Sequence, residues 1–329
     1  IEENPGMEVA AIAHNGKEAL KVLDSGEKVD VITLDIEMPI MQGDTTLKHI
    51  MVRHPIPAVT ISSLSPDSLA KIFEFLQVGA VDFLPKPGAR DDSRQYGERL
   101  RDLVMKASRA NVGQFRRCRK STVQPAASEN GAISSRDRML LMVGAEGAHM
   151  DWFRLPLQEL TRKGILIGLQ KIVEGYLPPF CTLLQEYTAA SIVPLIDSAH
   201  LRPGCLYLGD ASFSLELAWT EAQDTPAISL HPPHSLPWET GIKRWLSTLA
   251  AIAGQRLSIL CLSGSGSLPP DLVCQVIESG ADFILPPRDS VMCTELIDSV
   301  LPYELLYPGH VIQGSLQNLA EVWLGNELS

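Results

Sequence analysis

The sequence has no apolar stretch that reaches the roughly 18 residues needed to cross a bilayer, so membrane insertion is not expected. It does not open with a basic segment followed by an apolar one, so a secretory signal is not expected either. The six cysteines are scattered without a Cys-x-x-Cys pair, which argues against a zinc ribbon or a disulfide scaffold and favours a reduced, cytoplasmic compartment. Basic residues are outnumbered, 28 against 39 acidic ones, and the net charge of −11 argues against general nucleic-acid binding.

What the sequence does contain is enough apolar material for two cores. Its 329 residues are 45% apolar and 20% charged, and this length exceeds one typical domain. Residues 1–105 hold 11 basic and 17 acidic groups, residues 106–138 hold 8 and 2, and residues 139–329 hold 9 and 20. The middle segment ends in a Ser-, Ala- and Gly-containing stretch without apolar periodicity, which indicates a linker. We therefore predict one domain over 1–105, a basic linker over 106–138 and a second domain over 139–329.

Both halves alternate short apolar strands with helical stretches, a pattern typical of α/β domains with parallel sheets. In the first half we expect strands around 29–37, 56–64 and 80–87, and helices around 16–23, 45–54, 67–79 and 98–107. In the second half we expect strands around 139–145, 165–173, 204–209 and 257–265, and helices around 239–254, 269–280 and 293–300. The tail after Leu301 is either a final strand and helix or an extension peculiar to this protein. Because chemistry in such sheets sits at the carboxyl ends of strands, those ends are the positions to inspect.

Three chemically useful side chains end three successive strands of the first half. Asp35 ends VITLD, Ser62 ends AVTIS and Lys86 follows VDFLP. This set suits phosphoryl transfer to a carboxylate, because Asp can act as the nucleophile and the Lys ammonium can neutralise the developing phosphoryl charge. The Ser hydroxyl can then bond a phosphoryl oxygen and report its arrival.

These residues resemble the receiver domain of two-component response regulators, a flavodoxin-like fold, over residues 1 to about 105. The resemblance implies that Asp35 is the phosphoacceptor, that Ser62 and Phe83 form the switch, and that Lys86 is the lysine of the family. It also implies that the carbonyl of Glu37 helps Asp35 to hold Mg²⁺.

The start of the chain departs from this pattern. Residues 1–20 resemble the end of the first receiver helix followed by the second strand, so the first strand is missing and we interpret the start as a truncation. In the family that strand carries an acidic pair that completes the magnesium site. Since Mg²⁺ usually needs one or two carboxylates among about six oxygens, phosphorylation is expected to be impaired in this chain.

The second half resembles the methylesterase domain of protein-glutamate methylesterases, the CheB-like chemotaxis response regulators. The resemblance rests on VGAEGAHMDWFRLPLQEL, EGYLPPF, HLRPGCLYLGDASFSLEL and LSILCLSGSG, in the family's order from about Met139 to about Ser299. It implies a doubly wound, mostly parallel α/β domain of the methylesterase type.

The catalytic positions of that family are substituted in this sequence. Its Ser, His and Asp triad falls here on Glu146, on Gly175 with Tyr176 as a one-residue alternative, and on Leu268. Glycine supplies no base and leucine cannot orient one, so esterase chemistry through an acyl-enzyme is not expected from these residues. A rearranged pair of Ser265 and His149 is the rescue that we would look for first.

Together these features predict a response regulator of a chemosensory-type pathway, phosphorylated on Asp35, whose output domain has lost catalysis and acts by binding. The resemblance implies a sensor histidine kinase of the chemotaxis type and chemoreceptors as partners. The alternative is an active protein-glutamate methylesterase and glutamine deamidase with relocated catalytic residues, and a third reading is a relic without function.

Overall fold

The computed structural model divides the chain into two compact units, Ile1–Arg117 and Cys118–Ser329. It describes residue 4 and residues 6–63, 66–88, 92–114, 138–173, 175–212, 214–220, 225–231 and 236–325. The division falls inside the predicted linker, and residues 115–137 of that linker lie outside the described residues. Each unit is described by itself below.

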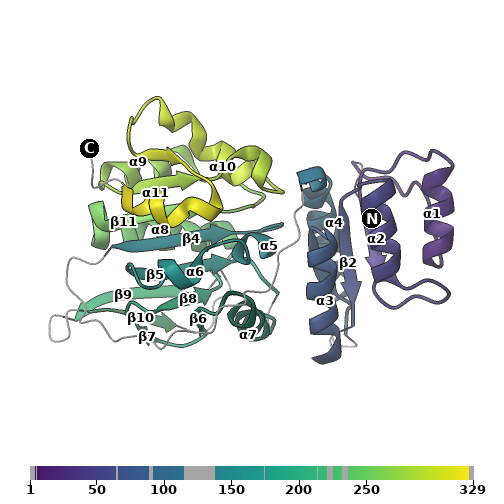
Figure 1. The fold of residues 1–329 in the computed structure, drawn as a ribbon, viewed down its shortest axis with the longest axis horizontal. Helices are drawn as coiled ribbons and strands as arrows, with labels where there is room; N and C mark the ends of the chain where they lie inside the picture. The colour runs from purple at the N-terminus through teal and green to yellow at the C-terminus, as the bar shows by residue number, and fades with distance from the viewer. Residues whose placement is uncertain are drawn as a thin grey trace. The chain divides into compact units, whose positions relative to one another are not determined.

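The first unit is built around a three-stranded parallel sheet in the order β1-β2-β3 (Figure 1). Its elements are α1 (Gly16–Asp24), β1 (Ile32–Asp35), α2 (Gly43–Arg53), β2 (Ala58–Ser62), α3 (Pro66–Val78), β3 (Asp82–Pro85), α4 (Ser93–Ala107) and the 3₁₀ helix η1 (Val112–Gln114). The register pairs Asp35 with Ile61 and Ser62 with Pro85. Because the strands run parallel, their carboxyl ends share one edge of the sheet.

The strand expected early in the first unit is not formed. Residues 7–13 belong to no strand, although six of these seven residues are apolar. A strand needs a neighbour for its ladder of hydrogen bonds, and β1 pairs only with β2 among the described residues. A cavity of about 750 Å³ lies along the open edge of β1, lined by residues 6–11, by Ala13 and by parts of α1, β1 and α4. Within the described residues, the sheet of this unit therefore consists of β1, β2 and β3 and lacks the strand that we expected in residues 1–20, the second strand in the receiver resemblance.

The second unit is built around a seven-stranded parallel sheet in the order β13-β12-β11-β4-β5-β8-β6. The sheet strands are β4 (Met139–Gly144), β5 (Ile165–Gln170), β6 (Ser191–Leu195), β8 (Cys205–Gly209), β11 (Leu257–Cys261), β12 (Asp282–Leu285) and β13 (Val311–Gln313). Its helices are α5 (His149–Trp152), α6 (Leu157–Leu160), α7 (Leu177–Thr188), α8 (Trp238–Ala253), α9 (Pro270–Glu278), α10 (Glu295–Val300) and α11 (Leu319–Gly325). Short 3₁₀ helices are η2 (Gly254–Arg256), η3 (Arg288–Ser290), η4 (Leu301–Glu304) and η5 (Leu316–Asn318).

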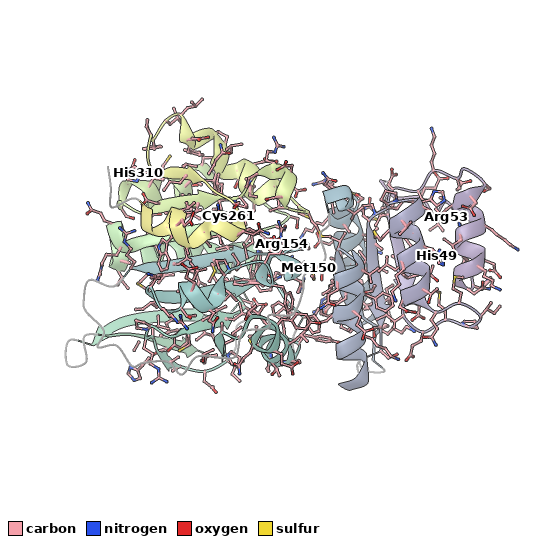
Figure 2. All side chains as sticks on the ribbon, in the orientation of Figure 1. His49, Arg53, Met150, Arg154, Cys261 and His310 are labelled. Atoms are coloured by element: carbon pink, nitrogen blue, oxygen red, sulfur yellow. The ribbon has the colours of Figure 1, made fainter. Side chains whose placement is uncertain are left out.

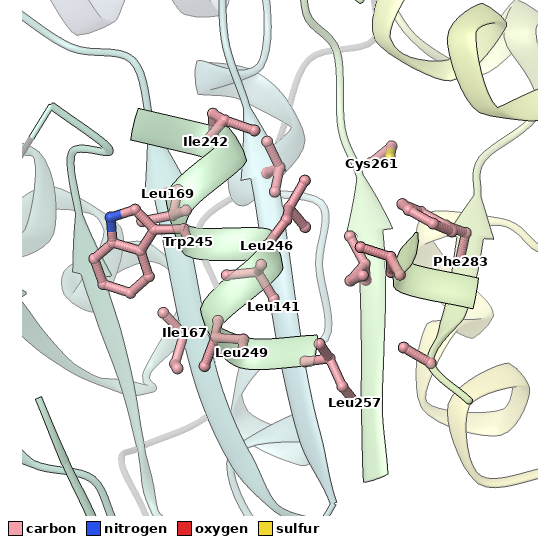
Figure 3. Packing of buried hydrophobic residues seen from close by; sticks show 14 of the residues in the cluster. Leu141, Ile167, Leu169, Ile242, Trp245, Leu246, Leu249, Leu257, Cys261 and Phe283 are labelled. Atoms are coloured by element: carbon pink, nitrogen blue, oxygen red, sulfur yellow. The ribbon is translucent and has the colours of Figure 1, made fainter. Parts of the chain in front are cut away.

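Helices cover both faces of this sheet, so its central strands are buried along their whole length. On one face, α8 packs Ile242, Trp245, Leu246 and Leu249 into the core formed with β4, β5 and β11 (Figure 3). On the other face, Trp152 of α5 approaches the backbone of β5 so closely that a side chain at Gly168 would collide with it. The apolar residues of α8 at helical spacing thus belong to the core. No helix in the described ranges is long and apolar enough to span a membrane.

Two further features complete the second unit. A small antiparallel sheet, β7-β10-β9, is formed by β7 (Ala199–His200), β9 (Ser214–Thr220) and β10 (Thr225–His231). The C-terminal tail forms a final strand and helix, β13 and α11, and Trp323 of α11 is buried. Arg138, just before β4, donates a hydrogen bond from Nη1 to the Trp323 carbonyl oxygen at 2.6 Å, so the tail is fastened to the first strand of the unit.

Candidate functional site

In the first unit the structure brings Asp35 and Lys86 together at the carboxyl edge of the sheet. The Lys86 ammonium lies 2.6 Å from Asp35 Oδ2, and both side chains are about one-third exposed. The Glu37 amide donates to Asp35 Oδ1 at 3.0 Å. The carboxylate is therefore held by a cation on one oxygen and by a backbone donor on the other, while it stays open to solvent.

The two predicted switch residues lie on the neighbouring strands. Ser62 is buried at the end of β2, and its hydroxyl donates to the Ser63 carbonyl at 3.2 Å. Its own carbonyl accepts from the Lys86 amide at 2.6 Å, so the position of Lys86 is tied to the end of β2. Phe83 is fully buried within β3. Their roles as a switch remain a prediction.

The loop between β1 and α2 folds back, so that Gly43 at the start of α2 lies against Ile36, the first residue after β1. The Gly43 amide donates to the Ile36 carbonyl at 3.2 Å, and a side chain at Gly43 would lie within 2.4 Å of the Asp35 carbonyl oxygen. At the tip, Ile40 has a φ of 66° and is largely exposed, while the Met41 amide donates to the Pro39 carbonyl at 2.7 Å. A β-branched residue is strained at this φ, so the loop keeps its shape at a cost on the order of 1–3 kcal/mol.

The residues present do not fit the magnesium site that the receiver resemblance implies. Receiver domains generally use Mg²⁺ for phosphorylation. Here Asp35 supplies one carboxylate and Glu37 one carbonyl, and an ammonium already contacts Oδ2 of Asp35. No group of three His, Cys, Asp or Glu residues that could hold a metal occurs within the described part of the chain. Mg²⁺ usually keeps several waters and takes one or two carboxylates, and here it would have to compete with the Lys86 ammonium for Asp35.

In the second unit the three substituted triad positions follow adjacent strands. Glu146 comes just after β4, Gly175 lies between β5 and α7, and Leu268 lies between β11 and α9. The sheet order β11-β4-β5 makes these strands neighbours, so their loops share one edge. The turn after β4 and the turn after β11 are joined directly, because the Ala145 amide donates to the Ser263 carbonyl at 2.9 Å.

Glu146 is the centre of a polar cluster at this edge. Its side chain is only 3% exposed, and the ammonium of Lys171 lies 2.8 Å from Oε1. The Ser265 hydroxyl donates a very short hydrogen bond to Oε2. Lys171 is the first residue after β5, and Ser265 lies in the turn after β11. The Glu146 carboxylate, which follows β4, therefore binds side chains from the ends of both neighbouring strands.

A second buried carboxylate lies beside this cluster. Asp151 Oδ2 accepts from the Ser263 amide at 2.8 Å, and Oδ1 lies 3.4 Å from Arg154 Nη1. Burial raises the pKa of Asp151 to about 6, although the Ser263 hydrogen bonds and Arg154 favour its ionised form. Arg154 also donates to the Ser290 carbonyl at 2.6 Å (Figure 2 labels Arg154 and Met150 in this region). These contacts pin the turn after β4 to two other loops of the same edge.

His149 is buried in apolar surroundings and is not the base that the rescue hypothesis required. Its ring packs edge-on against Phe180, with ring centroids 5.5 Å apart. Burial lowers the pKa of His149 to about 4, although the nearby Glu146 carboxylate opposes this, so the ring is neutral at pH 7. The hydrogen bond of the Ser265 hydroxyl goes to Glu146. The structure thus contradicts the Ser265–His149 pair, because a carboxylate attracts the hydroxyl more strongly than a neutral ring.

Of the remaining triad positions, Gly175 and Leu268 carry no acid or base, and the alternative Tyr176 is buried, which raises the pKa of its hydroxyl. Gly175 has a φ of 85°, a conformation that a histidine or any other L side chain would adopt only under strain. Leu268 is buried, and its amide donates to the Ser299 hydroxyl at 3.1 Å. Position 175 therefore has a backbone conformation that suits the glycine present there.

Two polar side chains of this edge were missed from the sequence. Lys171 lies inside ILIGLQKIV, which we interpreted as one strand, but β5 ends at Gln170 and leaves the lysine at the carboxyl edge. Gln170 is fully buried; it accepts from Trp152 Nε1 at 2.6 Å and donates to the Ala145 carbonyl at 3.0 Å. A charged residue directly after an apolar run was the available signal for Lys171.

Replacing Lys171 with methionine should lower the free energy of unfolding of the second unit by about 2 kcal/mol, because it leaves a buried carboxylate without its cation. Urea unfolding followed by tryptophan fluorescence measures this. Arg288→Met removes the exposed Arg288–Asp298 pair of the same unit and should cost less than about 0.5 kcal/mol. Adding Glu146→Gln to Lys171→Met should recover part of the lost stability, because the double variant no longer buries a carboxylate without its cation. If the two variants lowered the free energy of unfolding equally, the buried Lys171–Glu146 pair would stabilise the unit no more than an exposed pair does.

The stability of the second unit should depend on pH through His149. Its folded pKa of about 4 lies below the ordinary value of 6.5, so the unfolded chain binds the proton more readily between these values. The contribution is fully present above pH 6.5 and is lost as the pH falls toward 4, by roughly 3 kcal/mol in all. Urea unfolding at pH 7 and pH 4.5 should show a smaller decrease for His149→Phe than for the natural chain. An identical decrease would show that His149 does not titrate as described.

Comparisons with known proteins agree with the geometry of both units. The response regulator receiver domain model matches residues 1–96. A protein-glutamate methylesterase/protein-glutamine glutaminase of Rhodopseudomonas palustris is 31% identical over 252 residues, covering 71% of this chain and 68% of the relative. A second relative of the same description, from Vibrio vulnificus, is 29% identical over 307 residues, covering 89% of this chain and 84% of the relative.

Two solved structures of Thermotoga maritima are also similar. The CheB methylesterase catalytic domain matches with a TM-score of 0.49 and 14% identity, covering 58% of this chain and 98% of that domain. The CheB response regulator domain matches with a TM-score of 0.30 and 36% identity, covering 34% of this chain and 84% of that domain. From the length and identity of the sequence matches, the chain belongs to the CheB-like family of protein-glutamate methylesterase/protein-glutamine glutaminase response regulators.

Proposed function

We propose that this chain is a response regulator of a chemosensory-type two-component pathway, phosphorylated on Asp35, whose methylesterase-like output domain acts by binding. The observation that carries the proposal is the state of the nucleophile position, where a buried glutamate is paired with Lys171 and Ser265. The partners of the family, a chemotaxis histidine kinase and chemoreceptors, are proposed for this chain.

The edge of the first unit supports phosphoryl transfer to Asp35. A carboxylate oxygen attacks the phosphorus of a phosphohistidine, the phosphorus–nitrogen bond breaks, and the imidazole leaves with the bonding electrons and takes a proton from water. The Lys86 ammonium, 2.6 Å from Asp35 Oδ2, can neutralise charge on the incoming phosphoryl oxygens. Ser62, tied to Lys86 through its carbonyl, is placed to respond to the new group.

The edge of the second unit supports binding better than hydrolysis. Acyl transfer needs a nucleophile held against a base, and a third group that orients the base. Glu146, Gly175 and Leu268 do not make such a set. Loss of a triad reduces turnover by on the order of 10⁶. The helices and strands that shape the edge are nevertheless intact, so its surface can still recognise a partner.

A second candidate is a hydrolase in which Ser265 is the nucleophile and Glu146 the base. The hydrogen bond from the Ser265 hydroxyl to the Glu146 carboxylate favours it, because it is the contact that activates a serine. The ion pair with Lys171 opposes it, since a neighbouring ammonium makes a carboxylate a weaker base. We therefore rank binding first.

Asp35 should be the only residue that acetyl phosphate labels, and the labelling should be slow. The donors around Asp35 do not complete a magnesium site, so adding Mg²⁺ should accelerate labelling little. Mass spectrometry of the labelled chain measures the rate, and Asp35→Asn should abolish it. Fast labelling that depends on Mg²⁺ would show that the available ligands suffice.

Methanol release from methylated chemoreceptor fragments should stay at background, while the same fragments bind the chain. A coupled methanol assay and a pull-down on the same samples measure the two. Ser265→Ala separates the candidates: the binding function predicts no change in methanol, whereas the relocated hydrolase predicts its loss. Methanol release that depends on Ser265 would reject the binding function in favour of the hydrolase.

A further inference from the structure

A cavity of about 540 Å³ lies at the amino edge of the seven-stranded sheet, opposite the edge that carries Glu146. Figure 2 labels His310, which lines this cavity, on one side of the unit and Arg154, near the Glu146 cluster, on the other. Since β4 has six residues and a strand rises about 3.3 Å per residue, the two edges are about 20 Å apart. The cavity wall is built at the starts of parallel strands, by Arg138, Arg256, Ser258 and Asp282.

Two arginines form the cationic part of this wall. Arg138 precedes β4 and Arg256 precedes β11, and these strands are neighbours in the sheet. Backbone carbonyls orient both guanidinium groups: Arg138 Nη1 donates to Trp323 at 2.6 Å, and Arg256 Nη2 donates to Ile252 at 3.3 Å. A guanidinium has five N–H donors, and its planar fork matches the oxygens of a phosphate or a carboxylate. This part of the wall therefore favours an anionic group.

The wall beside β12 and β13 is acidic. Asp282 begins β12 and lies 2.9 Å from Nδ1 of His310, which directly precedes β13. Glu278, the last residue of α9, is exposed at the same cavity. Carboxylates accept hydrogen bonds from hydroxyl groups and repel a second anion. A ligand that fills the cavity thus has to bring negative charge to the arginines and hydroxyl donors to the carboxylates.

Ser258 is an independent observation that points to a polar ligand. It lines the cavity, is only 9% exposed, and its hydroxyl makes no hydrogen bond within the described part of the chain. A buried hydroxyl without a partner costs free energy, so proteins seldom retain one that binds nothing. The cavity volume lies within the range of about 300–1,000 Å³ that is typical of small-molecule sites.

We propose that this cavity binds a small phosphate ester that carries free hydroxyl groups, of the sugar phosphate class. The phosphate binds Arg138 and Arg256, and the hydroxyl groups donate to Asp282 and Glu278. Inorganic phosphate leaves the acidic part of the wall unused, and an uncharged sugar leaves the arginines unused, so tight binding requires both halves of the ligand. The site shares no residue with the Glu146 cluster, so this inference goes beyond the proposed function and does not depend on it.

Isothermal titration calorimetry of the full chain tests the site, with ribose 5-phosphate and glucose 6-phosphate as probes. We expect saturable binding of at least one probe, and binding weaker by about tenfold or more for inorganic phosphate and for the free sugar at the same ionic strength. Arg256→Met should weaken binding of the sugar phosphate by about tenfold or more, because it removes charged hydrogen bonds. Arg288→Met, which removes an exposed guanidinium of the same unit outside the cavity wall, should leave binding unchanged.

A second variant keeps the test decisive if Arg256→Met does not fold. Gln255 is exposed in the cavity wall, so Gln255→Glu should fold and should weaken binding severalfold by repelling the phosphate. Equal affinity for inorganic phosphate and the sugar phosphates would mean an adventitious ion only and would overturn the proposal. It is also overturned if neither probe binds saturably, or if Arg288→Met weakens binding as much as the cavity variants do.

Discussion

The carboxyl ends of neighbouring parallel strands lie at one edge of a sheet, and both candidate sites depend on this constraint. In the first unit it places Asp35 and Lys86 in contact although 51 residues separate them. In the second unit it gathers Glu146, Lys171 and Ser265 from three adjacent strands. Neither cluster depends on one flexible loop, because each side chain lies within a few residues of a buried strand. A different strand order would separate the residues of both sites, even if every strand and helix kept its own conformation.

The same constraint explains why the substituted triad positions still form an ordered polar cluster. Once the nucleophile position holds a glutamate, its buried charge needs partners, and the adjacent strand ends supply an ammonium and a hydroxyl. Asp151 and Gln170 then link the turns below it through backbone contacts. The resulting cluster is fully paired, which is the condition under which polar groups are tolerated in a protein interior.

The sequence allowed a good prediction of the features that depend on local pattern. Apolar runs ending in Asp35, Ser62 and Lys86 located the first edge, and the order of motifs located the second sheet. The features that failed depend on partners distant in the chain. Residues 7–13 have the composition of a strand but no strand beside them, and Lys171 was hidden because an apolar run does not show where its ladder of hydrogen bonds stops. The choice of Glu146 over His149 as the partner of Ser265 could not be predicted either, because it depends on side-chain directions rather than on spacing.

The hydrogen bond between Arg138 and the Trp323 carbonyl has a consequence for the architecture of the second unit. It places the residue before β4 against α11, so the first and last described elements of the unit lie close together. Proteins whose ends meet tolerate circular permutation and insertion into a host loop. The hydrogen bond thus makes this unit a candidate for such rearrangements, because a new connection between its described ends would have only a short distance to span.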